Sequence, residues 1–426
     1  MSDKKLNRIH SAINDYLYHL GLFSRNVRLY LAAAFLIGLT YSGYMLLLNL
    51  YLREQGSTES FIGTILSAGA IGMTITSIPA SFILRRIRLK KILLSTTVLY
   101  GGSILFLTWL PVSQLLVVIS FLAGIALTFY RVAAAPFFMR NSTPKERTYI
   151  FSLSFGVSLL ASVLGSMVFG WMVTALTTMA GGVIPAYRWT FALSVGLGLL
   201  ALIPFSMIRA ADPGFEEKRS EFSLALIKKR SGLYFRLFLP YFVVGTGAGL
   251  IIPFLNLYFR DRFRQPPDMI GFFFMVVNIT MFVGILLGPI LARKIGMVRT
   301  LVSTQLLSIP FMVILAYTYS LELAFVCFLI RGGLMNMGSP IGTNFGMEMV
   351  TQKEHALVNA LFMFGWNSSW MISTAVGGRL IEKHGYTLPL MITVGLYMLS
   401  SILYYMFFRD SEKHTRDGYL VESQPL

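Results

Sequence analysis

The stretch LNLYLRE at residues 48–54 returns as LNLYFRD at residues 255–261, 207 positions later. Three further matches follow in order at an offset of 208: FIG at 61–63 with MIG at 269–271, LRRIRLKK at 84–91 with ARKIGMVR at 292–299, and PKER at 144–147 with QKEH at 352–355. One match would be weak, but four in order at nearly one spacing indicate an internal repeat. The two halves of the chain are therefore predicted to be structural copies.

The sequence around these matches is strongly apolar. Of its 426 residues, 55% are hydrophobic and only 13% are charged, which is about half the charge of an average soluble domain. Runs of about 20 mostly apolar residues, the length that crosses a bilayer core, recur with short polar breaks. They predict twelve spans, at 27–52, 61–84, 92–110, 114–139, 148–174, 187–208, 234–259, 269–292, 298–318, 322–346, 356–378 and 387–408.

The longest polar interruption divides the spans six and six. We therefore expect an all-α membrane protein with twelve transmembrane helices in two parallel six-helix pseudo-repeats. Its parts are a cytoplasmic amphipathic segment at 1–26, a first half at 27–208, an interdomain loop at 209–233, a second half at 234–408 and a cytoplasmic tail at 409–426. In the first segment, apolar residues recur at helical spacing between charged ones, as in a helix that lies on a membrane surface.

The net charge of +17 reports topology. With the amino terminus placed inside, the inward segments hold 27 of the 36 Lys and Arg and the outward segments hold 7. This asymmetry follows the positive-inside rule and predicts that both termini are cytoplasmic. A basic surface for nucleic acid is therefore not expected, and the protein should lie in the plasma membrane, the inner membrane of a bacterium.

These features resemble the major facilitator superfamily over roughly residues 25–410. The basic loops after the second and eighth spans and the PKER loop after the fourth carry the resemblance. In that family the loop after the second helix usually reads Gly, three residues, Asp, Arg, one residue, Gly and then basic residues. Arg86, Lys90 and Lys91 keep this pattern, whereas Ser81, Arg85 and Arg88 depart from it.

The departures concern conformational gating. The family's Asp is held to stabilise the outward-facing state through a charge contact between the halves, but arginines occupy its two positions here, which puts that contact in question. We expect the basic loops and the interfacial acids to take part in gating, namely Arg85, Arg86, Arg293, Glu146, Glu348 and Glu354. The alternative for the basic loops is that they only anchor the chain on the cytoplasmic side.

All 19 carboxylates fall in loops, tails or the end turns of spans. Proton coupling usually uses a titratable group buried in the membrane, so coupling to protons would need an unusual route. The sequence also has no Gly followed by Lys, and so no P-loop through which ATP could act. We expect no enzymatic activity, no cofactor and no metal site.

Two arginines lie within this acid-poor interior, Arg131 in the fourth span and Arg331 in the tenth. Each costs about 2.5–3.5 kcal/mol on insertion scales. The first hypothesis is that they bind an anionic group of the substrate, because a guanidinium fork suits carboxylate and phosphate. The alternative is that each packs against helix carbonyls or neighbours such as Tyr130 and fixes a kink.

Three asparagines within the spans are further candidate binding groups, Asn49, Asn256 and Asn336. Polar residues in spans also bridge helices, at about 0.6 kcal/mol per bond, so each asparagine has either a binding role or a bridging role at this point. The predicted function is that of a monomeric secondary active or facilitative transporter that moves a small solute, with an anion as the first hypothesis. The alternatives are a lipid flippase on the same fold and a transport-inactive receptor or scaffold.

Overall fold

The computed structural model describes residues 21, 23–209, 230–351 and 354–409. Within these ranges the chain forms helices and no strand, which confirms the predicted all-α class. The expected amphipathic segment lies almost entirely outside the described residues. The same holds for most of the expected interdomain loop and tail.

The first half consists of α2 (Arg25–Glu54), α3 (Glu59–Arg86), α4 (Leu89–Trp109), α5 (Leu115–Arg140), α6 (Pro144–Met179), α7 (Val183–Leu199) and α8 (Leu202–Met207). Ser24 and Thr58 open the first two of these helices, because each side-chain oxygen accepts a hydrogen bond from a backbone N–H in the first turn. The predicted sixth span corresponds to α7 and α8 together, with α7 beginning four residues earlier than expected and a turn at Leu200 and Ala201 between the two helices.

The second half consists of α10 (Ser231–Ile251), η1 (Ile252–Phe254), α11 (Leu255–Phe263), α12 (Pro267–Ile295), α13 (Met297–Tyr317), α14 (Leu321–Glu348), α15 (His355–His384) and α16 (Thr387–Phe408). The predicted seventh span is divided because Pro253 has no N–H to continue the α-helical ladder, and one 3-10 turn replaces it. This break places Asn256 in the first turn of α11.

Among the described residues, eleven segments are long and apolar enough to cross a membrane. The remaining long helix is α15, which has 30 residues but is not among these eleven, and it carries the polar run Trp366–Trp370 in its middle. It packs against α3 of the first half and α10 of the second. Neighbouring helices therefore cover much of the helix that hydropathy alone would miss.

The sequence repeat is also a repeat of contacts. In the first half the hydroxyl of Tyr51 donates to the carbonyl oxygen of Thr108, and in the second the hydroxyl of Tyr258 donates to that of Leu315 at 2.8 Å. Both bonds join residues 57 positions apart and tie the first span of a half to its third span. The two six-helix bundles are thus built around the same internal bond.

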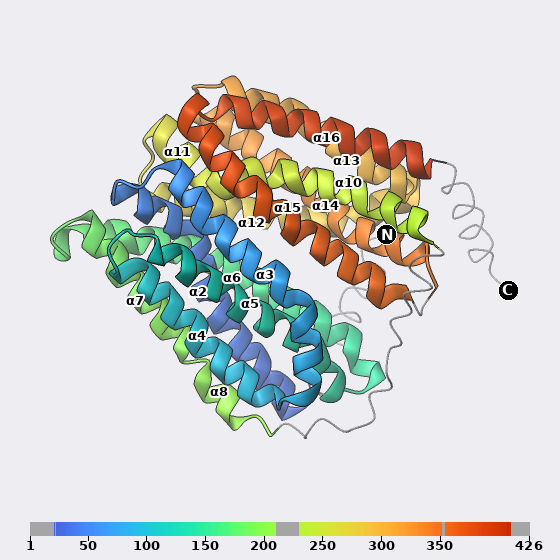
Figure 1. The fold of residues 1–426 in the computed structure, drawn as a ribbon, viewed down its shortest axis with the longest axis horizontal. Coiled ribbons are helices and arrows are strands. Elements are labelled where there is room, and N and C mark those ends of the chain that lie inside the picture. Colours follow the sequence, from blue (N-terminus) through green and yellow to red (C-terminus); the bar gives the residue numbers. More distant parts are fainter. Residues whose placement is uncertain (1–20, 22, 210–229, 352–353, 410–426) are drawn as a thin grey trace, which may run out of the picture.

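The two halves meet at one end of the molecule and spread apart toward the other (Figure 1). We call the end with the 55–58 turn the distal face and the end where α8 and α16 finish the terminal face. One apolar cluster, which includes Tyr51 and Phe259, contains residues of both halves. Toward the terminal face the first half has its own cluster around Phe137 and the second half another around Phe362. The halves are therefore joined near the distal face.

Candidate functional site

Two asparagines join the halves across the seam, the surface on which the bundles face each other. Asn49 of α2 donates from Nδ2 to the carbonyl oxygen of Pro253 at 2.6 Å and to Oδ1 of Asn256 at 3.3 Å. Asn256 donates in return to the carbonyl oxygen of Leu46 at 2.7 Å. Both asparagines are buried. In this conformation they bond to each other's helices, which is the helix-bridging role that the sequence left open.

Two crossings of glycines bring the halves together on either side of this pair. At one, Gly63 of α3 meets Gly378 of α15, and at the other Gly170 of α6 meets Gly271 of α12. Gly63 and Gly271 are 208 positions apart, as are Gly170 and Gly378, so the repeat relates the two crossings. A Cβ at Gly63 would lie 2.5 Å from the carbonyl oxygen of Thr374, and one at Gly170 would lie 2.6 Å from that of Pro267. Only glycine permits such an approach of backbones.

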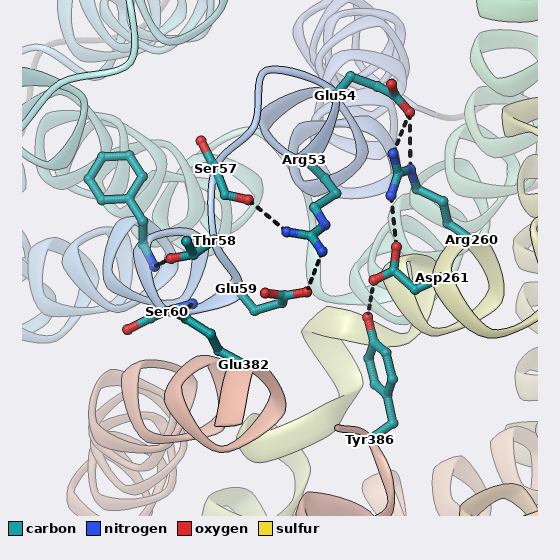
Figure 2. A network of polar contacts seen from close by, with 11 residues as sticks. Arg53, Glu54, Ser57, Thr58, Glu59, Ser60, Arg260, Asp261, Glu382 and Tyr386 are labelled. Carbon is teal, nitrogen blue, oxygen red and sulfur yellow. Dashed lines mark hydrogen bonds and ion pairs between the residues drawn. The ribbon is translucent and has the colours of Figure 1, made fainter. Parts of the chain in front are cut away.

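A charged network closes the seam at the distal face (Figure 2). Arg260 of α11 donates from Nη2 to Oε1 of Glu54 at 2.7 Å, across the halves, and from Nη1 to Asp261 at 2.7 Å. Arg53 pairs with Glu59 at 3.1 Å within the first half. Tyr386 donates to Asp261 at 2.6 Å, and burial together with the carboxylate beside it raises the pKa of Tyr386 well above its usual range. The tyrosine thus remains a donor at any ordinary pH.

The network surrounds a cavity of about 650 Å³ on the distal face. Its charged lining consists of Arg53, Glu54, Glu59, Arg260, Asp261 and Arg264. Buried side chains also line it, namely Leu50 and Ile381, and Asn49 is the residue that precedes Leu50 on α2. In this conformation the distal cavity is a vestibule above a closed seam.

Below the asparagine pair, side chains near the centre of the seam are exposed, while on one side α3 and α15 remain in contact, where Ser67 donates to the carbonyl oxygen of Met371. Met45 lies one turn before Asn49, on the face of α2 that Asn49 turns toward the other half, and its side chain is 41% exposed. One turn further, the ring of Tyr41 lies 5.0 Å from the guanidinium carbon of Arg131 on α5. Arg131 is exposed, and among the described residues no acidic group pairs with it. An uncompensated cation therefore faces the open part of the seam.

Arg331 has a different environment. It is 5% exposed and lies inside the second bundle, where Nη2 donates to the hydroxyl of Tyr397 on α16 at 3.1 Å. Its Nε has no hydrogen-bond partner among the described residues. The two arginines are thus not equivalent, because Arg131 is accessible and Arg331 is enclosed.

Two predicted gating acids are equivalent through the repeat and lie at the terminal face. Glu354 is 3% exposed and accepts hydrogen bonds from Tyr234 at 2.6 Å and from Thr351, and it pairs with Arg230 at 3.2 Å. The bonds from Tyr234 and Thr351 lower the pKa of Glu354 to about 2. Glu146 is also buried and accepts a bond from Thr143 at 2.6 Å. Both acids fix the start of a helix within their own half.

The remaining predicted residues lie apart from these clusters. Asn336 is half-buried on α14 and donates to the carbonyl oxygen of Gly332 at 3.0 Å. Arg293 is exposed in the last turn of α12, and Glu348 ends α14, where it accepts a bond from Asn344 at 2.9 Å. Arg85 and Arg86 are in the last turn of α3, and their side chains lie outside the described part of the structure.

Sequence reasoning missed the charged network and the glycine crossings. The signal for the network was present, because the repeat LNLYLRE and LNLYFRD contains both Glu54 and Arg260. The repeat could also have marked the glycines, since each lies 208 positions from its counterpart. What the sequence did not contain was which helix of one half crosses which helix of the other.

Comparisons with known proteins agree on one fold. The sequence profile described as Major Facilitator Superfamily matches residues 30–240 and 237–423. No curated protein sequence matches the chain.

Three solved structures illustrate the likeness of fold. The nucleoside transporter NupG has a TM-score of 0.75 at 11% identity, with 91% of this chain and 99% of that chain covered. A bacterial homologue of the human lysosomal transporter Spinster, inward-facing and unoccupied, has a TM-score of 0.74 at 12% identity, with 90% and 96% covered. The D-xylose-proton symporter has a TM-score of 0.71 at 13% identity, with 89% and 97% covered.

Proposed function

This chain belongs to the major facilitator superfamily, and from that premise we propose that it is a secondary active or facilitative transporter of a small organic anion. It works by alternating access, in which the two halves rock around a site at the seam. The observation that carries the anionic substrate is Arg131, an exposed cation on the open seam with no acidic partner among the described residues. An incoming anion would supply the missing countercharge.

The cost of Arg131 supports this role. A charged side chain within a span is unfavourable by about 2.5–3.5 kcal/mol, so its presence calls for a compensating interaction. The contact with the Tyr41 ring supplies about 0.5–2 kcal/mol of that, which is less than the whole. A carboxylate on the guanidinium fork would add a charge-assisted bond that exists only with substrate bound.

Arg331 supports the anion at longer range. It is enclosed beside Tyr397, so direct contact with a solute is not its role in this conformation. Its charge nevertheless adds to a positive potential in the interior, where the described residues place no acid beside it. We assign affinity to Arg131 and a field contribution to Arg331.

The direction of access follows from the charge asymmetry. The seam is closed at the distal face and open toward the terminal face, where the basic loops expected inside the cell lie. We propose that the terminal face is cytoplasmic, that both termini are inside and that the structure is inward-facing.

Uptake into liposomes that contain the pure protein tests this function. Thermal-shift screening of organic anions, sugars, amino acids and drugs selects the solutes to follow. Arg131→Gln, which keeps donors but removes the charge, should weaken binding of a transported anion by about 1.5–3 kcal/mol, or about 10- to 150-fold. The matched control is Arg236→Gln, whose guanidinium lies over Phe407, on α16 of its own half.

The other outcomes separate the alternatives. If no anion binds or moves while neutral solutes do, the anionic assignment is wrong. Transfer of a labelled phospholipid with no solute flux would indicate a flippase. Folded protein with no flux of either kind would indicate a receptor or scaffold.

A further inference from the structure

We infer that the substrate is a polyhydroxylated monocarboxylate. Its carboxylate meets Arg131 in the first half, and its hydroxyl groups meet a neutral polar stripe on α14 in the second, formed by Asn336, Ser339 and Thr343. The inference rests on the proposed transport function and specifies the chemistry of the site. It depends on what the repeat places opposite Arg131.

The repeat identifies Ser339 as the counterpart of Arg131. The two residues are 208 positions apart, on the fourth helix of their respective halves. The register holds at this level of the bundles, because Gly124 of α5 contacts Gly69 of α3 just as Gly332 of α14 contacts Val277 of α12. Both members of the second pair lie 208 positions after those of the first. Since Arg131 faces the open seam, Ser339 faces it from the other side.

The stripe follows from the helical period. Asn336 lies three residues before Ser339 and Thr343 lies four residues after it, so the three side chains share one face of α14. Ser339 and Thr343 are exposed, and Asn336 is half-buried. This face therefore presents an amide and two hydroxyls to the seam.

These groups keep unused hydrogen-bonding capacity. Asn336 donates to Gly332 and Thr343 donates to the carbonyl oxygen of Ser339 at 3.3 Å, both within the helix. The amide oxygen of Asn336 and the hydroxyl of Ser339 have no described partner. A solute hydroxyl, which both donates and accepts, matches such groups, whereas a bare hydrocarbon would leave them unpaired.

The number of cationic groups at the site indicates how many negative charges the substrate carries. Arg131 is the single accessible cation described on this part of the seam, and one guanidinium balances one carboxylate. A phosphate monoester carries a charge of about −1.5 to −2 at neutral pH and would remain partly uncompensated. An amino acid would bring an ammonium group, for which the described residues offer no acid paired with Arg131, and the acid that ends α14, Glu348, already accepts a bond from Asn344.

Binding of four matched probes to the purified full-length protein tests the inference. They are gluconate, which has both features; hexanoate, which has the charge alone; glucose, which has the hydroxyls alone; and glucose 6-phosphate, which has the larger charge. Gluconate should bind at least about 10-fold more tightly than each of the other three, the usual effect of one lost bond to a charged group or of unpaired polar groups.

Variants assign the two preferences to the two halves. Arg131→Gln should remove the preference for gluconate over glucose. The double variant Asn336→Ala with Ser339→Ala should remove the preference over hexanoate and leave hexanoate binding within about 2-fold. Ser303→Ala is the control, because that serine of α13 bonds within its own helix to Thr300.

Three results would overturn the inference. They are equal binding of hexanoate and gluconate, a double variant that keeps the full preference over hexanoate, and tighter binding of glucose 6-phosphate. In each of these an anion still binds, so the proposed transport function survives. If no anion binds the folded wild-type protein, the proposed function itself fails.

Discussion

Glu54 and Arg260 form an ion pair across the seam, whereas Arg53 and Asp261, their counterparts in the repeat, are not joined in the described contacts. Arg53 pairs with Glu59, and Asp261 with Arg260 and Tyr386. The pseudo-symmetry of the helices is therefore broken in the charges that close the distal face. One cross-half pair carries the charge contact that two could have carried.

Glu54→Gln should weaken distal closure only slightly. The Glu54 and Arg260 side chains are 31% and 27% exposed, and such pairs contribute about 0.2–1 kcal/mol, less at high salt. The labelling rate of Met45→Cys from the distal side, in a Cys327→Ser background, should rise up to about 5-fold at low salt. The control is Glu322→Gln, whose carboxylate bonds to Ser320 of its own half. A rise that is independent of salt would contradict the ion-pair explanation.

Asn49→Ala should have the larger effect. It removes two buried donor contacts and leaves the carbonyl oxygen of Pro253 without this partner, which costs about 1–3 kcal/mol. The same labelling assay at Met45→Cys should show a greater rise than for Glu54→Gln. Thr40→Ala removes a buried bond to Ser194 inside the first half, so it should leave labelling unchanged. Equal labelling of the Asn49 and Thr40 variants would show that the asparagine pair does not hold the seam.

Gly63→Val and Gly170→Val should each abolish uptake while the protein remains folded. The added side chain would collide with backbone of the other half, at Thr374 or Pro267, so no rotamer relieves the contact. The distal-closed state is then lost, and distal labelling of Met45→Cys should approach completion. Gly102→Val is the matched control, because a Cβ there has nothing within 4 Å. Normal uptake in the Gly63 variant would mean that the crossing does not form during transport.

Glu354→Gln should lower stability at neutral pH. The folded-state pKa of about 2 lies below the ordinary value of about 4.3, so the charged form stabilises the fold fully above about pH 4.3. That contribution is lost as the pH falls through about 2. The variant should lose about 1.5–3 kcal/mol at pH 7, and the difference in unfolding midpoint should shrink below pH 4. A difference that stays constant from pH 7 to pH 3 would point to lost packing instead of lost charge.

Labelling of single cysteines tests the proposed orientation. In a Cys327→Ser background, an impermeant maleimide should label Ser113→Cys on intact cells, because this exposed residue precedes α5 at the distal face. Lys91→Cys, at the opposite end of α4, should be labelled only after the cells are permeabilised. The reverse pattern would place both termini outside.

The sequence was sufficient to predict the architecture, because the repeat and the apolar runs can be recognised from the order of the residues alone. It could place Arg131 and Arg331 within spans but not say which one is accessible. A helix in lipid is apolar on its outer face and on its packed faces alike, so its pattern does not reveal the direction of a side chain. The direction of Arg131 became clear only from its contact with Tyr41 and from the orientation of Asn49.

The asparagines illustrate the same limit of prediction from sequence. Asn49 and Asn256 occupy equivalent positions of the repeat, and that pattern favours bridging between helices while leaving substrate binding open. Their mutual bond depends on the packing of α2 against α11 and on the break at Pro253. Contacts between halves are set by tertiary structure, and a single sequence contains no direct signal for them.

The glycine crossings also specify what a smaller ancestor could assemble. Gly63 and Gly271 are one position of the repeat, and Gly170 and Gly378 are the other. A six-helix polypeptide with one glycine near the start of its second helix and one near the end of its fifth would supply both crossings by forming a dimer in which the two copies have the same orientation in the membrane. Two glycines per copy would then build two crossings of two glycines each, and fusion of the copies would preserve them without any new surface.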